Sequence, residues 1–237
     1  MEGEIMNGHY AIAIDGPSGA GKSTIARAAA SDYGFIYVDT GAIYRTVGLA
    51  AFNNELDRRD ETAVAAILPE LNIEMKYSAE GEQRMYLNGT DVSKEIRRPE
   101  ISICASDVAA LPAVRTFLLE LQRKMARENS VIMDGRDIGT VVLPDAELKI
   151  FLTASAEARA QRRMLELENK GIKSSFEEVL RDIEYRDAQD SGRAAAPLKR
   201  ADDAVEIDTS SINFDESLKL VESVIEQHLK IGRRTNK

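Results

Sequence analysis

The fold of this 237-residue chain is decided by the stretch GPSGAGKS, residues 16–23. It matches the pattern G-x-x-x-x-G-K-[ST], in which glycines let the backbone wrap closely around a phosphate group and backbone N–H groups supply positive charge. The apolar run Tyr10–Ile14 precedes the stretch, and the alanine-rich segment Ser23–Tyr33 follows it. A strand, a glycine-rich loop and a helix in this order predict a nucleoside triphosphate site; the alternative is a glycine-rich turn that only closes a βα unit.

Four further apolar runs predict strands of the same sheet. They are Phe35–Val38, Val131–Met133, Leu148–Leu152 and Ala204–Ile207. The runs are continuous rather than alternating, which is typical of parallel strands buried on both faces. We therefore expect an α/β protein with the three-layer fold of P-loop NTPases and a five-stranded parallel sheet.

Helical segments separate these strands, and one stretch has a different pattern. Helices are predicted over Ala42–Phe52, Glu61–Leu68, Pro99–Glu128, Ala156–Lys170, Phe176–Asp190 and Asp215–Lys230. In contrast, residues Asn72–Ile96 alternate side-chain character at period two and contain a glycine-bearing link, Ser78–Gln83. This pattern predicts a small antiparallel hairpin inserted into the α/β chain.

Composition excludes several classes of protein. The net charge of −9 argues against broad binding of nucleic acid or anionic membranes, and no apolar run is long enough to span a bilayer. The start Met1–Tyr10 has no signal-peptide pattern, a lone Cys104 excludes an internal disulfide, and two histidines exclude a histidine-rich metal site. We expect a cytoplasmic protein, a monomer, with no nucleic-acid or membrane partner.

The loop and the strand over residues 131–133 predict the donor site. The nucleotide-binding residues are expected to be Gly16, Pro17, Ser18, Gly19, Ala20, Gly21, Lys22, Ser23 and Thr24. Lys22 should reach the β- and γ-phosphates of ATP, and Ser23 offers a hydroxyl to the accompanying Mg²⁺. Asp134, at the carboxyl end of its strand, is the second expected Mg²⁺ ligand, although acidic residues after strands also serve as turn residues.

Clustered arginines indicate what the nucleotide is for. Arg159, Arg162 and Arg163 share one face of a predicted helix, and Arg186 and Arg193 follow in a polar segment. Several cations near a P-loop suit transfer to a phosphorylated acceptor, because two polyanions must be brought together. Residues 156–194 therefore predict a helical lid, with glycines 171 and 192 as hinges. The alternative for each arginine is a solvated helix face.

These motifs together resemble the bacterial cytidylate kinase family of nucleoside monophosphate kinases. The resemblance is carried by IAIDGPSGAGK (12–22), DTGAIYR (39–45), DGRDIGTVV (134–142), residues 159–164, Arg186 with Asp187, and AAPL (195–198). It implies a single P-loop kinase domain over residues 1–237 with a monophosphate-binding insert at 70–98. The implied reaction is ATP-dependent phosphorylation of CMP and dCMP to CDP and dCDP, with Mg²⁺.

The resemblance also implies roles for individual residues. The implied catalytic residues are Lys22, Arg136, Arg159, Arg186 and Arg193. The implied substrate-binding residues are Thr40, Tyr44, Arg45, Ser106, Arg115, Arg136, Asp137, Arg186 and Asp190. Among them, Asp137, Ser106 and Arg115 read the cytosine base. Two alternatives stay open: a kinase of another small acceptor, such as another monophosphate or shikimate, and a nucleotide-dependent switch.

Overall fold

The computed structural model describes residues 9–78, 83–169 and 171–233. It contains two compact units, one formed by Met1–Tyr37 with Ala126–Lys237 and the other by Val38–Met125. The predictions for Lys170 and for residues 79–82 of the hairpin link lie outside the described residues.

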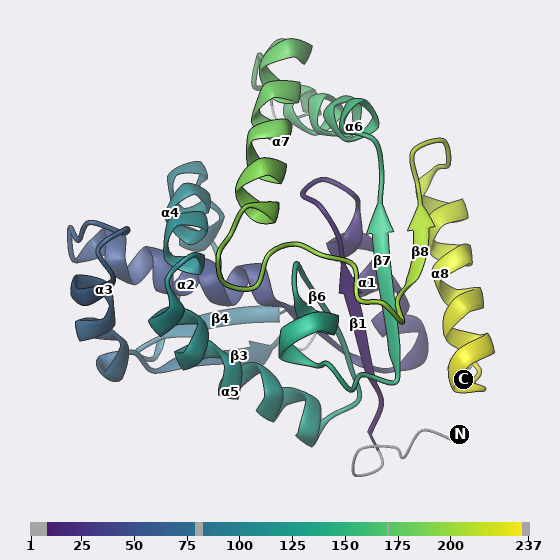
Figure 1. The fold of residues 1–237 in the computed structure, drawn as a ribbon, viewed down its shortest axis with the longest axis horizontal. Helices are drawn as coiled ribbons and strands as arrows, with labels where there is room; N and C mark the ends of the chain where they lie inside the picture. Colours follow the sequence, from purple (N-terminus) through teal and green to yellow (C-terminus); the bar gives the residue numbers. More distant parts are fainter. Residues whose placement is uncertain (1–8, 79–82, 170, 234–237) are drawn as a thin grey trace. The chain divides into compact units, whose positions relative to one another are not determined.

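A five-stranded parallel sheet is the centre of the first unit (Figure 1). Its strands are β1 (Ala11–Asp15), β2 (Ile36–Asp39), β6 (Val131–Gly135), β7 (Leu148–Thr153) and β8 (Val205–Asp208), in the order β2-β6-β1-β7-β8. Strand β1 is central and pairs in parallel with β6 on one side and β7 on the other. The five predicted strands are therefore confirmed; the boundary between the two units falls within β2.

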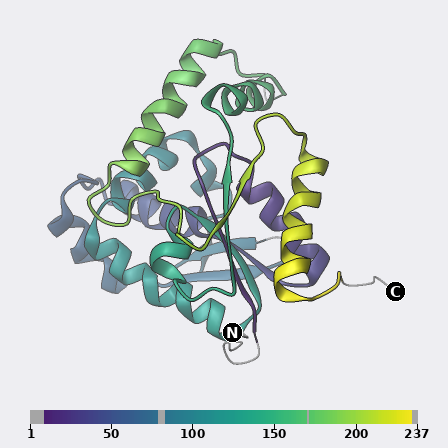
Figure 2. The same ribbon diagram turned by 45° about the vertical axis from the view of Figure 1, so that its right-hand side comes forward.

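Two helices of the first unit pack on the buried side chains of this sheet. Figure 2 shows α1 (Lys22–Tyr33) and α8 (Phe214–Leu229) side by side. Ile12, Ile150 and Val221 belong to one core cluster formed by the sheet and these helices. Helix α8 begins with a capping box, in which Asn213 and Glu216 satisfy each other's backbone N–H groups. The core holds the loop between β1 and α1 on a rigid base.

Two helices follow β7 and form a hairpin with a small core of its own. Helix α6 (Ala156–Asn169) packs against α7 (Phe176–Ser191) through Ala160, Val179 and Ile183 (Figure 1). Most of the predicted lid region lies in this hairpin. A short π-helix, η4 (Ile138–Val142), follows β6 and had no counterpart among the predicted elements.

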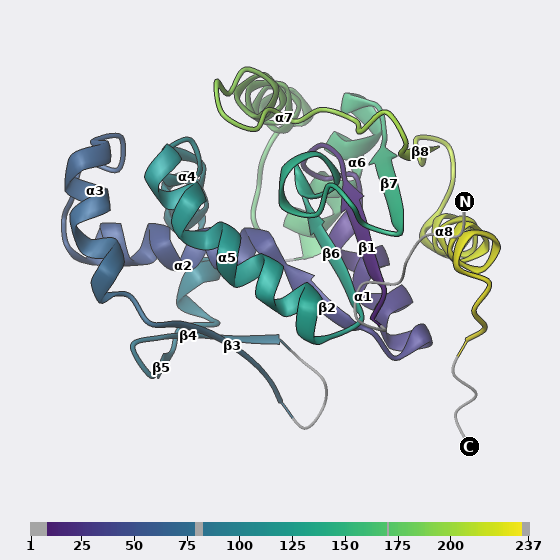
Figure 3. The same cartoon turned by 60° about the horizontal axis from the view of Figure 1, so that its bottom comes forward.

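The second unit combines helices with a small antiparallel sheet (Figure 3). Its helices are α2 (Thr40–Asn53), α3 (Glu61–Ile67), α4 (Pro99–Ala109) and α5 (Pro112–Glu128), with 3₁₀ turns at Leu68–Glu70 and Glu95–Arg97. Its sheet contains β3 (Ile73–Tyr77), β4 (Gln83–Leu87) and β5 (Thr90–Asp91). The predicted hairpin is present as β3 and β4, and β5 adds a third strand.

One helix prediction was wrong. Residues 99–128 form two helices, α4 and α5, with axes bent by 99° at the break, rather than one helix. Pro112 explains the break, because proline has no N–H to donate and disfavours the helical conformation at the residue before it. Within the described residues no single helix is long and apolar enough to cross a membrane, although this bent pair meets the length and composition criterion together. Cys104 on α4 is buried.

Candidate active site

The loop between β1 and α1 wraps closely enough to require glycine at its first position. Gly16 has φ +147°, and a Cβ placed there would lie 1.9 Å from the carbonyl oxygen of Leu152. Lys22, the first residue of α1, is buried, and its Nζ donates a hydrogen bond of 2.7 Å to the carbonyl oxygen of Pro17. The lysine therefore folds back over the loop that is predicted to hold the phosphates.

The environment of Lys22 lowers the pKa of its ammonium group. Burial is the largest cause, and the positive charge of Arg136 is the second; together they lower the pKa of Lys22 to about 7. The carboxylates of Asp134 and Asp15 act in the opposite direction. A polyanion in the loop would favour the charged lysine, so the site is suited to a phosphate chain.

The two residues predicted to bind Mg²⁺ lie together. Ser23 Oγ donates to Asp134 Oδ2 at 2.8 Å, and the phenol of Tyr37 donates to the other carboxylate oxygen, Oδ1, at 2.9 Å. Ser23 is exposed on the first turn of α1, whereas Tyr37 and Asp134 are buried. Hydroxyl and carboxylate oxygens are the ligands that Mg²⁺ prefers, so this pair fits a nucleotide-borne Mg²⁺.

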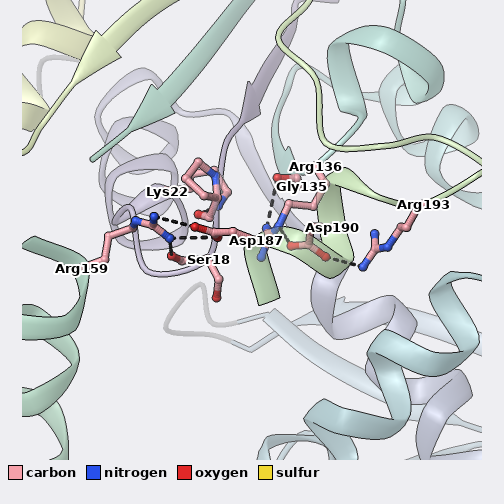
Figure 4. A network of polar contacts seen from close by, with 9 residues as sticks. Ser18, Lys22, Gly135, Arg136, Arg159, Asp187, Asp190 and Arg193 are labelled. Atoms are coloured by element: carbon pink, nitrogen blue, oxygen red, sulfur yellow. Dashed lines mark hydrogen bonds and ion pairs between the residues drawn. The ribbon is translucent and has the colours of Figure 1, made fainter. Parts of the chain in front are cut away.

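Arg159 joins the helical hairpin to the phosphate loop (Figure 4). Its side chain is buried and forms a two-pronged ion pair with Asp187 of α7, with N–O distances of 2.9 and 2.6 Å. The same guanidinium donates to the carbonyl oxygens of Ser18, at 3.1 Å, and of Ala154, at 2.9 Å. Arg162, one turn further on, instead donates to the backbone of Thr209 and Ile212. Arg159 therefore contacts the phosphate loop and α7, whereas Arg162 contacts the backbone of residues 209 and 212.

A second ion-pair group lies at the end of α7, where the buried Asp190 accepts from two arginines (Figure 4). Arg136 Nε donates to one carboxylate oxygen at 2.6 Å, and Arg193 Nη2 donates to the other at 2.5 Å. Arg186, also on α7, is exposed. Four of the five predicted catalytic residues, Lys22, Arg136, Arg159 and Arg193, therefore lie in the polar network of the first unit.

The turn after β6 is fixed by a carboxylate from β1. Asp15 accepts from the backbone N–H groups of Ile138, at 2.8 Å, and Gly139, at 2.7 Å. Burial outweighs these hydrogen bonds and raises the pKa of Asp15 to about 6. Asp137, one residue before this contact, is also buried.

The second unit holds the remaining predicted substrate residues on three helices. Thr40, Tyr44 and Arg45 lie in the first turns of α2, where Arg45 Nη2 donates to Asp39 Oδ2 at 3.0 Å. Arg115 of α5 lies over the ring of Tyr44, with 5.7 Å from its guanidinium carbon to the ring centroid. Ser106 of α4 is exposed. Tyr44 and Arg115, which are 71 positions apart in the sequence, are thus neighbours.

Two residues of the site were not predicted from the sequence. Tyr37 lies in a predicted apolar strand, and nothing in the sequence indicates that its hydroxyl meets Asp134. Asp15 ends β1 directly before the phosphate loop. This position at the ligand-binding edge of the sheet is a sequence signal for a role in the site.

The fold and the phosphate loop define a P-loop nucleotide-binding protein. The family model for cytidylate kinase matches residues 12–229. The chain is 47% identical over 230 residues to a cytidylate kinase of Lactobacillus johnsonii, covering 97% of this chain and 100% of the relative. It is 46% identical over 226 residues to that of Pasteurella multocida, covering 95% and 99%. The chain therefore belongs to the cytidylate kinase family, as the motifs predicted.

Two further proteins are similar to this chain. The cytidylate kinase of Caldicellulosiruptor bescii is 49% identical over 210 residues, covering 89% of this chain and 92% of the relative. A shikimate kinase structure from Bacteroides thetaiotaomicron has a TM-score of 0.46 and 10% identity, covering 94% of this chain and 99% of that one. That structural likeness is too low to support shikimate as the acceptor.

Proposed function

We propose that this enzyme transfers the γ-phosphoryl group of ATP to CMP or dCMP, releasing ADP and CDP or dCDP. The match to the cytidylate kinase family over residues 12–229 is the observation that carries the proposal. The transfer proceeds in line and without a covalent intermediate, so positioning and charge stabilisation supply the rate. The protein is proposed to act in the cytoplasm as a monomeric, single-domain kinase.

The donor is held by residues 16–24. Backbone N–H groups of the loop and of the first turn of α1 bind the phosphates, and Lys22 turns from Pro17 toward the β- and γ-phosphates. Ser23 and Asp134, which already contact each other, would hold the Mg²⁺ that accompanies ATP, and the ion would neutralise charge on the phosphates. Tyr37 keeps the carboxylate of Asp134 in place from the opposite side.

Arginines supply the positive charge around the transferred group. Arg136, Arg159 and Arg193 are held by Asp187 and Asp190, so each is already placed before a phosphate arrives. Arg186 is exposed and joins when the hairpin of α6 and α7, within the lid region 156–194, closes. Closure excludes water, which would otherwise take the phosphoryl group.

The acceptor is held by its phosphate, base and sugar. Arg45 takes part in phosphate binding with Arg136 and Arg186; its Nε is buried and has no hydrogen-bond partner among the described residues. Such a donor fits an arriving anion. Thr40 and Tyr44 line the pocket, Asp190 accepts from the sugar hydroxyls, and the insert at 70–98 encloses the monophosphate.

Base selection rests on three residues. Cytosine carries an exocyclic amino donor beside ring acceptors, and uracil presents the opposite pattern. Asp137 accepts from the amino group, while Ser106 and Arg115 donate to the ring. Arg115 is already held over Tyr44 and by the carbonyl oxygen of Ala109, at 3.3 Å.

An acceptor panel tests this function. Purified enzyme is incubated with Mg·ATP and CMP, dCMP, UMP, AMP or shikimate, and ADP release is followed. We expect release that depends on CMP or dCMP and is at least tenfold faster than with any other acceptor. Equal rates with CMP and UMP would contradict the role of Asp137, and slow hydrolysis indifferent to every acceptor would favour the nucleotide-dependent switch.

A further inference from the structure

A buried carboxylate before the phosphate loop caps a helix that it does not belong to. The π-helix η4 begins after Asp137, whose own side chain makes no capping hydrogen bond. Instead, Asp15 of β1 accepts from the first two N–H groups of the helix, those of Ile138 and Gly139, at 2.8 and 2.7 Å. The capping residue is thus 123 positions away in the sequence from the first residue it caps.

This cap closes a short span of backbone around two functional residues. In the sheet, Asp15 is the register partner of Gly135, the last residue of β6. Its side chain holds Ile138 and Gly139, so one residue of β1 fixes the backbone both before and after Arg136 and Asp137. The position of these two side chains therefore depends on Asp15.

The space around the carboxylate is filled. A Cβ on Gly139 would lie 3.1 Å from Lys149 Cδ and 3.4 Å from Asp15 Oδ2. The stem of Lys149 packs over this point, and its Nζ is bound to both carboxylate oxygens of Asp203, at 3.0 and 2.7 Å. Asp15 itself is 4% exposed. Another group or a water molecule would therefore find little room to replace the carboxylate if it were lost.

We propose that Asp15 is a positioning residue for acceptor selection, which holds Asp137 and Arg136 at the cytosine base and the acceptor phosphate. This inference rests on the proposed function. The hydrogen bonds of Asp15 go directly to the turn after β6, whereas it acts on the ATP site through its charge, which helps to keep Lys22 protonated. Its loss therefore changes the use of the acceptor more than the use of the donor.

The variant Asp15→Asn separates this role from simple packing. The amide has almost the same shape as the carboxylate, but its NH₂ group meets one of the two backbone N–H donors with no acceptor to offer. Asp60→Asn is the matched control, because Asp60 also accepts from two backbone N–H groups, at 2.9 and 3.1 Å, as the N-cap of α3. Asparagine is itself a good N-cap, so this control should keep its helix.

The test measures kcat and KM for CMP, UMP and ATP at pH 8 in the wild type and both variants. For Asp15→Asn we expect kcat/KM for CMP to fall about 30-fold, the CMP-to-UMP selectivity to fall about tenfold and KM for ATP to change by less than about twofold. Hydrogen exchange at the amides of Ile138 and Gly139 should also rise. Asp60→Asn should resemble the wild type in all these quantities.

Each result has a defined meaning. Equal losses for CMP and UMP, or a rise in KM for ATP as large as the loss for CMP, would overturn the role of Asp15 even if the wild type selects CMP. Unchanged exchange at residues 138 and 139 would overturn the capping argument. A wild-type enzyme that uses UMP as well as CMP would refute the proposed function itself, and this inference with it.

Discussion

Arg159 and Asp187 form a two-pronged ion pair, with N–O distances of 2.9 and 2.6 Å, in which the arginine is buried. The pair links α6 to α7, and Arg159 also binds the carbonyl oxygen of Ser18 in the phosphate loop. One guanidinium therefore connects the helical hairpin with the loop. A planar group with five donors can make all these contacts, whereas a lysine ammonium cannot reproduce them.

Replacing Arg159 by lysine should therefore damage catalysis while keeping one positive charge. We expect Arg159→Lys to lower kcat about 30- to 100-fold, measured as CMP-dependent ADP release. Arg163→Lys is the control on the same helix, because Arg163 is exposed and pairs with Glu166 at 2.9 Å. It should stay within about twofold of the wild type. If both variants behaved alike, Arg159 would have no special role in transfer.

Lys22 should take up a proton when ATP binds. Its pKa is lowered to about 7 by burial and by Arg136, and the phosphates should raise it again. At pH 8 most of the free enzyme then holds a neutral lysine, so binding of Mg·ATP should take up about 0.9 proton. Calorimetric binding enthalpies in buffers of different ionisation enthalpy measure this number. Lys22→Arg should show almost no uptake, because arginine is always charged; buffer-independent enthalpies in the wild type would disprove the shifted lysine.

The hydroxyl of Tyr37 should matter for Mg²⁺. Tyr37→Phe removes the donor to Asp134 Oδ1 and leaves the ring in place, so the carboxylate is less well oriented. We expect the Mg²⁺ concentration needed for half-maximal ATP binding, measured by calorimetry, to rise about tenfold. Tyr33→Phe loses a hydroxyl bound to Glu222 and Glu226 and serves as the control. Equal Mg²⁺ dependence in the two variants would remove Tyr37 from the site.

The framework of the fold was accessible from the sequence, because its determinants are local. The strands β1, β6 and β7 are continuous apolar runs, and the residues between β1 and α1 follow a fixed pattern. Pro112 is a sequence signal for the break between α4 and α5. The helical pattern is strong on both sides of this proline, so the sequence favoured a single helix. The π-helix after β6 could not be predicted, because its cap is Asp15, a residue distant in sequence.

The residues of the candidate site likewise fall into two groups: those that a sequence pattern predicts and those that only the packing of the fold brings together. Lys22 and Ser23 follow from a motif, and Asp134 follows from its place after a strand. The ion pairs of Asp187 and Asp190 with arginines depend on how α7 packs, which a sequence pattern does not contain. The role of Tyr37 could not be predicted for the same reason, because the pairing order of the strands brings its hydroxyl to Asp134.

Asp15 should also make stability depend on pH. Its pKa is about 6 in the folded protein and near 3.8 when unfolded, so the folded state binds more protons between these values. The contribution of Asp15 to the free energy of unfolding is greatest below pH 4 and is lost as the pH rises through 6. The free energy of unfolding of the wild type relative to Asp15→Asn should therefore fall by up to about 3 kcal/mol from pH 4 to pH 7. Urea denaturation across this range checks the slope; a difference that stays constant or grows with pH would contradict the raised pKa.

Transfer of labelled phosphate tests the central claim most directly. ATP labelled at the γ-phosphate is mixed with Mg²⁺, CMP and the enzyme, and the nucleotides are separated. We predict that the label appears in CDP, that free labelled phosphate stays near background, and that Lys22→Ala abolishes the transfer. Label released as free phosphate at the same rate with and without CMP would contradict the account.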